Sequence, residues 1–111
     1  MVTAGAWDLQ IEQGSTFAET YTCTNDDGSP IDWARWTARA QIRVLAAPDA
    51  ELLLDLTPYL TITGAAITVL IPATITATLT RSGRWDLEVT DGTTVMRLLE
   101  GRALLAPEVT Q

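Results

Sequence analysis

The sequence predicts an all-β domain, an antiparallel β-sandwich of about seven or eight strands. Several stretches alternate apolar and polar residues with a period of two, which is typical of half-buried strands. Clusters of turn-forming residues separate these stretches at intervals of about 8–12 residues. The chain also contains 18 Thr among its 111 residues, and this β-branched residue favours strands. This length suits one domain with a single modest core.

The most regular pattern lies in residues 84–105 and predicts a β-hairpin. The outgoing strand alternates polar residues with three apolar ones, Trp85, Leu87 and Val89. Asp91-Gly92 then predicts a tight type I′ turn, which needs positive φ at both central positions. On the return strand, Gly101 is typical of a bulge or a close backbone approach. Without a bulge, one face of that strand carries Val95, Leu99, Ala103 and Leu105, and the other carries Leu98 and Leu104.

The remaining elements follow the same reasoning. We expect residues 1–6 to form a flexible N-terminal arm and residues 7–111 to form one domain. Further strands are expected at residues 7–12, 16–23, 37–45, 51–56, 60–63 and 66–71. A short helix is expected near residues 72–80, because Pro72 suits a first helical turn.

For the second expected strand, residues 16–23, the sequence does not decide which face is buried. One face would carry three apolar residues and the charged Glu19; the apolar residues are Phe17, Tyr21 and Cys23. The opposite face would carry Ala18, Thr20 and Thr22. Glu19 is unfavourable in a core, so either face is a candidate for the buried side.

The composition excludes several classes of function. The chain has no His and no Lys, which removes the usual general base, the nucleophile triads, ordinary zinc sites and Schiff-base chemistry. The net charge of −7 argues against nucleic-acid binding but is compatible with a basic protein partner. Cys23 is the single cysteine, so no internal disulfide forms, and we expect it to be a small buried apolar residue. We therefore predict no enzymatic activity and no cofactor.

No targeting or membrane segment is expected. The N-terminal residues lack a basic region followed by an apolar run, so no secretion signal is visible. No apolar stretch approaches the roughly 18 residues that a spanning helix needs. We therefore expect no membrane association.

The four Trp are candidates for the core or for an interface. Trp7 and Trp85 fit core positions on strands, whereas Trp33 and Trp36 bracket a turn. Core packing is the ordinary role of such residues, and an exposed aromatic at a protein interface is the alternative. A sugar-binding platform that uses Trp33, Trp36 or Tyr59 is a further alternative, without a supporting motif.

Two acidic groups have both ordinary and functional interpretations. The segment Asn25–Asp27 has the residues of a turn, and calcium binding is the alternative. Glu51 and Asp55 would share one face of a strand, where they form either a solvated surface or a carboxylate pair.

Five stretches together resemble a family of small virion proteins of tailed bacteriophages. They are IEQGSTF (11–17), DDGSPID (26–32), WTARAQIR (36–43), WDLEVTDGTTVMRLLEGR (85–102) and APEVT (106–110). Such proteins resemble the immunoglobulin-like N-terminal domain of phage baseplate upper proteins. The resemblance implies an immunoglobulin-like β-sandwich that serves as a non-catalytic building or docking module. We expect the protein to be a lone domain, without the long coiled or fibrous extension of baseplate upper proteins.

From the resemblance we expect a structural virion protein, assembled in the bacterial cytoplasm in many symmetric copies. It would dock onto other phage proteins, first of all in the tail or baseplate. A capsid decoration (cement) protein is one alternative, and a carbohydrate-binding module at the host surface is another. The predicted interface residues are Trp33, Trp36, Leu98 and Leu104.

Overall fold

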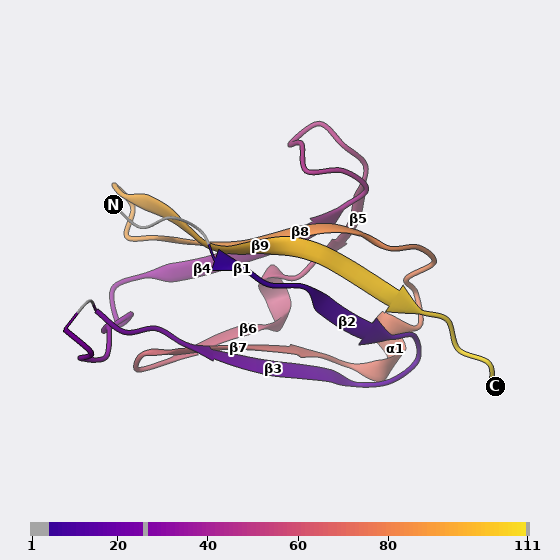
Figure 1. Ribbon diagram of the computed structural model, residues 1–111, viewed down its shortest axis with the longest axis horizontal. Helices are drawn as coiled ribbons and strands as arrows, with labels where there is room; N and C mark the ends of the chain where they lie inside the picture. The colour runs from indigo at the N-terminus through magenta and orange to yellow at the C-terminus, as the bar shows by residue number, and fades with distance from the viewer. Residues whose placement is uncertain (1–4, 26, 111) are drawn as a thin grey trace.

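A computed structural model describes residues 5–25 and 27–110 as two packed β-sheets (Figure 1). The strands are β1 (Gly5–Ala6), β2 (Leu9–Glu12), β3 (Phe17–Thr22), β4 (Thr37–Arg43), β5 (Leu52–Asp55), β6 (Leu60–Thr63), β7 (Ala66–Ile71), β8 (Gly83–Thr90) and β9 (Val95–Ala106). A 3-10 turn, η1 (Thr57–Tyr59), precedes β6, and a short helix, α1 (Ala73–Thr76), follows β7.

The strand order is that of an immunoglobulin-like sandwich. One sheet has the order β1-β9-β8-β4-β5, with β2 also paired to β9. The other sheet has the order β3-β7-β6. This partition places the equivalents of strands C, F and G, with an extra edge strand, against the equivalents of B, E and D. The predicted all-β immunoglobulin-like fold is therefore confirmed by the topology itself.

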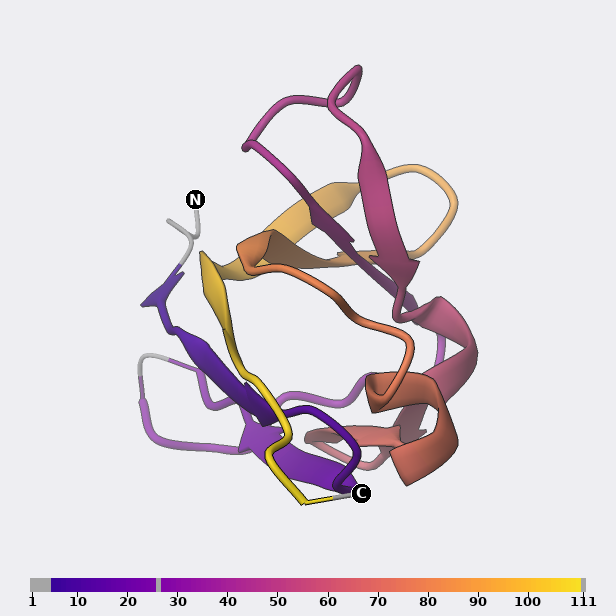
Figure 2. The ribbon, with the colours of Figure 1, turned by 90° about the vertical axis from the view of Figure 1, so that its right-hand side faces the viewer.

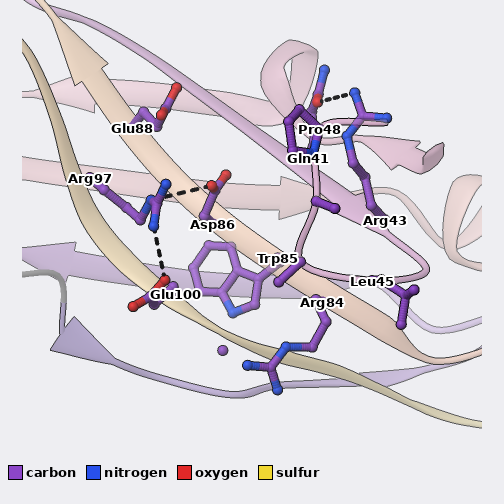
Figure 3. Close-up of a pocket in the computed structure, with 13 residues that line it drawn as sticks. Gln41, Arg43, Leu45, Pro48, Arg84, Trp85, Asp86, Glu88, Arg97 and Glu100 are labelled. Atoms are coloured by element: carbon purple, nitrogen blue, oxygen red, sulfur yellow. Dashed lines mark hydrogen bonds and ion pairs between the residues drawn. The ribbon is translucent and has the colours of Figure 1, made fainter. Parts of the chain in front are cut away.

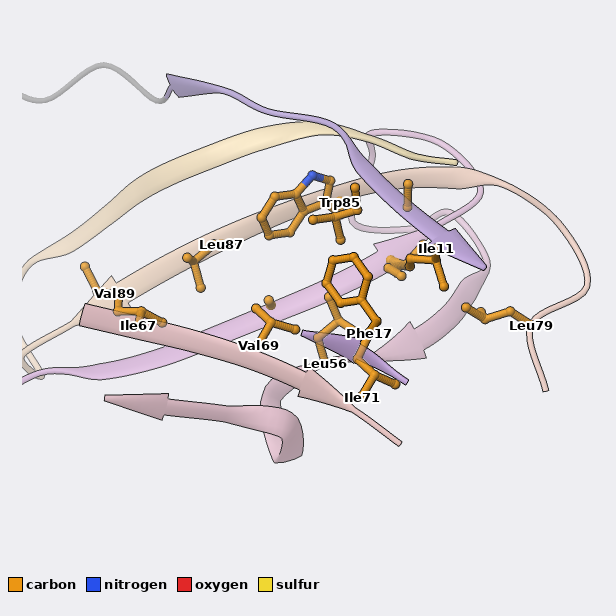
Figure 4. Packing of buried hydrophobic residues seen from close by; sticks show 14 of the residues in the cluster. Ile11, Phe17, Leu56, Ile67, Val69, Ile71, Leu79, Trp85, Leu87 and Val89 are labelled. Carbon is orange, nitrogen blue, oxygen red and sulfur yellow. The ribbon is translucent and has the colours of Figure 1, made fainter. Parts of the chain in front are cut away.

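The core lies between the two sheets, where apolar side chains of both interdigitate (Figure 4). Trp85, Leu87 and Val89 are buried, as their alternation on β8 predicted. On β3, Phe17 is buried while the side chains of Ala18, Thr20 and Thr22 are exposed, which decides the buried face of this strand. The face of β3 that carries Glu19 therefore looks toward the other sheet.

An aromatic contact joins the sheets where antibody domains carry a disulfide between strands B and F. The rings of Tyr21 on β3 and Trp85 on β8 have centroids 6.1 Å apart. Cys23 is half-buried and free. Packing of these two rings therefore connects the two sheets without a covalent link.

The prediction that Trp7 lies in the core is wrong, because its side chain is 48% exposed. The ladder with β9 is interrupted between β1 and β2. There the backbone N–H of Arg102 donates to Asp8 Oδ1 (2.9 Å), and the carbonyl of Trp7 accepts from Trp85 Nε1 instead (2.8 Å). Gly101 permits this arrangement, since a Cβ at that position would collide with the Trp7 carbonyl oxygen. The interruption turns the Trp7 side chain outward.

The β8–β9 connection differs from the predicted type I′ turn. Gly92 has the expected positive φ of 98°, but Asp91 does not have a positive φ. The loop instead spans residues 91–94, and the Asp91 carboxylate accepts from the backbone N–H groups of Thr93 and Thr94. Local side-chain bonding of this kind favours a longer turn.

Strand β9 contains a bulge that changes the predicted faces. Leu87 pairs with Leu99 and Glu88 pairs with Arg97, so Leu98 is the extra residue. Leu98 is half-buried and packs against the core, whereas Val95 is 53% exposed. The faces expected for a strand without a bulge therefore do not apply, because a bulge shifts the phase of every residue beyond it.

The expected short helix is present, and the structure refines its bounds and those of the N-terminal segment. The helix covers four residues, and hydroxyl groups of Thr76 and Thr78 bond back to the backbone carbonyls of Ala73 and Ile75. Such bonds compete with helix continuation. Gly5 and Ala6, predicted to belong to a flexible arm, form β1, and residues 1–4 lie outside the described part of the chain.

Candidate functional site

Strands β2 and β3 border one side of the sandwich without pairing to each other (Figure 2). A groove runs there along the inner side of β3. It consists of two cavities of about 790 and 550 Å³ that share Glu19, and we call it the β3 groove. Its larger part is lined mainly by aromatic and aliphatic side chains, among them Trp7, Tyr21, Ile31, Met96, Leu98 and Leu99. Its smaller part lies between β2 and the first half of β3.

Side chains from both sheets meet at Glu19. Trp7 Nε1 donates to Glu19 Oε1 (3.0 Å), and the hydroxyl of Tyr21 donates to the same oxygen (2.6 Å). The rings of Trp7 and Tyr21 pack edge to face, with centroids 6.5 Å apart. Glu19 therefore satisfies two aromatic donors, which explains how a carboxylate is accommodated on the inner face of a strand.

The groove is apolar and acidic. Glu12 and Glu19 are the charged residues of its lining, and neither cavity is lined by an Arg. Burial raises the pKa of the Tyr21 hydroxyl, and the bond to Glu19 raises it further, so this group stays protonated at neutral pH. Burial also raises the pKa of the Cys23 thiol, which lowers its reactivity as a nucleophile.

Three of the four predicted interface residues contribute to the β3 groove. Trp33 and Leu98 line the larger part and Leu104 lines the smaller part, whereas Trp36 lines neither. Trp33 was predicted to be an interface residue, but it is only 1% exposed. It therefore forms part of the floor of the groove and is not an exposed contact residue. The indole N–H of Trp33 finds no hydrogen-bond acceptor among the described residues.

Trp7 and Glu19, whose hydrogen bond bridges the two sheets in the groove, are not among the predicted interface residues. The position of Glu19 was a usable signal, because a carboxylate in phase with Phe17 and Tyr21 needs a partner when it faces inward. Nothing in the sequence identified Trp7 as that partner. The contact depends on an interruption between β1 and β2 that alternation does not reveal.

The other predicted sites are not assembled as functional groups. The rings of Trp33 and Trp36 meet at 83°, so they form no coplanar sugar platform, and Tyr59 packs against the core. Glu51 and Asp55 are exposed and line none of the three cavities described here.

The acidic turn is satisfied by its own hydrogen bonds. The Asp27 carboxylate accepts from the backbone N–H of Ser29 (2.9 Å) and from its hydroxyl (2.6 Å). Asp26 lies outside the described residues. Within residues 5–25 and 27–110, no group of three His, Cys, Asp or Glu side chains is placed to hold a metal ion.

A third cavity, of about 370 Å³, lies on the outer face of the larger sheet beneath the β4–β5 loop (Figure 3). Arg97 lies between Asp86 (3.5 Å) and Glu100 (3.2 Å). Burial, and next the charge of Glu88, raise the pKa of the Asp86 carboxyl. Glu88 pairs with Arg39, which lies outside the cavity lining. Surface pairs of this kind contribute only about 0.2–1 kcal/mol each.

Comparison with known proteins adds similarity of fold at low sequence identity. No protein-family model matches the chain, and no curated protein matches it either. The four N-terminal Ig domains of Dscam1 isoform 8.4 are similar with a TM-score of 0.45 and 8% identity. That match covers 96% of this chain but 23% of the Dscam1 chain.

A second similar structure is the extracellular domain of the voltage-gated sodium channel beta4 subunit. The TM-score is 0.43 at 12% identity, and the match covers 98% of both chains. The assignment of the immunoglobulin-like fold rests on the strand order described above. None of the helices in the described residues has the length and apolarity needed to cross a membrane.

Proposed function

We propose that this chain is a non-catalytic structural protein of a tailed-bacteriophage virion that docks onto other virion proteins through the β3 groove. The observation that carries the docking role is an open, apolar and acidic groove beside an unpaired strand edge. An interface needs shape, apolar area and satisfied polar groups. The groove offers a concave, largely apolar surface, and its carboxylate Glu19 is hydrogen-bonded by Trp7 and Tyr21. The virion assignment rests on the sequence resemblance.

The chemistry of the chain supports a binding role over catalysis. A protein without His or Lys lacks the residues most often used for proton transfer and covalent catalysis. The free thiol of Cys23 has a raised pKa, so it is a poor nucleophile. The net charge of −7 favours a partner with a basic surface.

The location in the virion that we propose is the tail or baseplate, with the protein present in many copies. A capsid decoration protein would use the same groove on a different neighbour. Sugar binding receives no support from the perpendicular rings of Trp33 and Trp36.

The test uses purified phage particles that carry wild-type protein or one of two variants. Trp7→Ala removes an exposed side chain from the groove, and Leu70→Ala removes a similarly exposed one (52%) from the outer face of β7. Mass spectrometry should find wild-type and Leu70→Ala protein at equal copy number and Trp7→Ala protein several-fold reduced. Cross-linking then identifies the tail, baseplate or capsid neighbour.

Two outcomes contradict the proposal. Absence of the wild-type protein from purified particles contradicts the virion role. Equal incorporation of Trp7→Ala and Leu70→Ala contradicts the use of the groove. Thermal unfolding of each variant must remain cooperative, so that a loss of incorporation reports on docking and not on folding.

A further inference from the structure

We propose that β3 accepts an extended segment of a partner protein as an added β-strand, with alternate side chains of that segment entering the β3 groove. The segment we infer is basic, with a central Arg or Lys opposite Glu19 and apolar residues on either side of it. This inference rests on the proposed docking function and names the partner's chemistry. An exposed strand edge is a template for such pairing.

The register of β3 shows which backbone groups are available. The N–H of Cys23 donates to the carbonyl of Ala65 (3.1 Å), and this pair continues the antiparallel register between β3 and β7. Hydrogen-bonded and non-hydrogen-bonded pairs alternate in such a ladder. The N–H and C=O groups of Ala18, Thr20 and Thr22 therefore point away from β7, toward the free edge.

A side-chain contact agrees with this assignment. Residues in non-hydrogen-bonded antiparallel pairs have closer side chains than those in hydrogen-bonded pairs. Thr20 and Thr68 form such a pair, and their hydroxyl oxygens lie 2.9 Å apart. The six residues of β3 thus present three donors and three acceptors along one edge.

Apart from the inward-facing Glu19, which Trp7 and Tyr21 hydrogen-bond, β3 carries none of the features that commonly discourage pairing at an edge. Proteins protect exposed edges with Lys, Pro, bulges or very short strands. The outward side chains of β3 are small and uncharged, and its pairing with β7 has no register shift. By contrast, β5 has four residues and a register irregularity in its pairing with β4.

The negative charge of the groove favours a basic partner segment. Glu12 and Glu19 line it without a basic residue, and the whole chain carries −7. Pairing of β3 with β3 of a second copy would bring two such acidic edges together, which like-charge repulsion disfavours. A basic side chain, in contrast, would add a charged donor to Glu19, whose two aromatic donors both bond to Oε1. A foreign basic segment therefore fits better than a second copy.

The test uses the full chain and a capped synthetic peptide, Thr-Val-Thr-Arg-Thr-Val-Thr. Hydrogen exchange of backbone amides is followed by NMR. At about ten times the dissociation constant, exchange at Ala18, Thr20 and Thr22 should slow about tenfold. A control peptide with Glu in place of the central Arg should give no protection.

Two further peptides test backbone pairing itself. One carries N-methyl groups at the even-numbered peptide positions, and the other at two interior odd-numbered positions. Backbone N–H groups of alternate residues point to opposite edges of an extended peptide, so each variant loses the N–H donors of a different edge. Strand addition predicts that one peptide fails to bind and that the other binds like the parent. Equal behaviour of the two, or no protection of the β3 amides by the parent, overturns the inference.

These outcomes are separable from those of the proposed function. If the wild-type protein is present in particles but the peptide gives no protection, strand addition is wrong and docking uses other contacts. If the peptide protects β3 but the protein is absent from particles, the edge binds strands and the virion role is wrong.

Discussion

The junction between the two sheets is covered differently on the two lateral sides of the sandwich. On one side the chain passes directly from β5 to β6, and residues 56–59 cover the junction of the sheets. The N–H of Leu56 donates to the carbonyl of Ala40 (2.9 Å), and the Thr57 hydroxyl donates to that carbonyl (3.3 Å) and accepts from the Ala40 N–H (3.2 Å). We call this the closed seam. Its Leu56 is fully buried.

On the other side the chain passes from β2 to β3 through residues 13–16, at the end of the two strands. Along the length of β3 the junction is bridged by side chains, from Trp7 to Glu19. A backbone crossing closes a junction permanently, because many groups must separate together for it to open. A side-chain bridge is exchangeable, because an incoming donor can replace one hydrogen bond. The difference explains why the groove lies along β3.

The largest expected effect is that of Trp85→Ala, which removes a large buried side chain that supports the β3 side of the sandwich. Trp85 is 3% exposed, packs on Tyr21 and donates to the Trp7 carbonyl. We expect a loss of about 3–5 kcal/mol in the free energy of unfolding. Urea denaturation measures it. A loss below about 1 kcal/mol would show that Trp85 contributes little to the core.

Leu56→Ala tests the closed seam and should cost about 2–5 kcal/mol, because truncation leaves a cavity under a fixed backbone crossing. Leu98→Ala is the matched change in the β3 groove, where the side chain is half-buried. We expect the Leu98 variant to lose clearly less stability, as measured by urea denaturation of both. Equal losses would mean that the two sides are packed equally well.

Gly101→Ala tests how the Trp7 side of the groove is built. The added Cβ would collide with the Trp7 carbonyl oxygen, so we expect a loss of about 1–3 kcal/mol. Faster hydrogen exchange at the Trp7 amide, which donates to the Glu100 carbonyl, should accompany it. Gly5→Ala is the control, since its Cβ would meet Leu99 at an ordinary 3.4 Å. Similar stability of the two variants would contradict the close approach.

The same comparison shows what the sequence can and cannot predict. The strands were predictable because alternation reports burial within one strand, as for Leu87 and Val89. The position of Trp7 was not, because the interruption after β1 depends on Gly101, which is 94 residues away in the chain. The bulge at Leu98 likewise depends on pairing with β8. A groove formed between two strands has no pattern within either one.

The four predicted interface residues illustrate this limit. Trp33, Leu98 and Leu104 do line the groove, because apolar residues near strand edges gather where two sheets meet. Their exposure was not predictable. An aromatic side chain such as Trp33 is buried or exposed according to what packs over it. Here its neighbours include Trp36, which packs edge to face against it.

The smallest expected effect concerns Tyr21→Phe, which removes one donor to Glu19 and keeps the ring that packs on Trp85. At neutral pH the loss should be about 1 kcal/mol, the typical contribution of one hydrogen bond. The pKa of Tyr21 is raised above its usual value of 10.0, first by burial and then by Glu19. The folded state therefore holds this proton more tightly than the unfolded state does.

A raised pKa gives the sign of the pH dependence. The stabilising contribution is complete below pH 10, the usual pKa of the group, and decreases as pH rises above it. The wild-type protein should therefore lose stability between about pH 10 and 11, whereas Tyr21→Phe should lose less, so the gap between them narrows. Urea denaturation of both proteins from about pH 8 to 11 measures that gap, and Tyr59 and Cys23 are common to both. A gap that stays constant over this range would mean that Tyr21 is not held protonated at the groove, and the side-chain bridge at Glu19 would then be Trp7 alone.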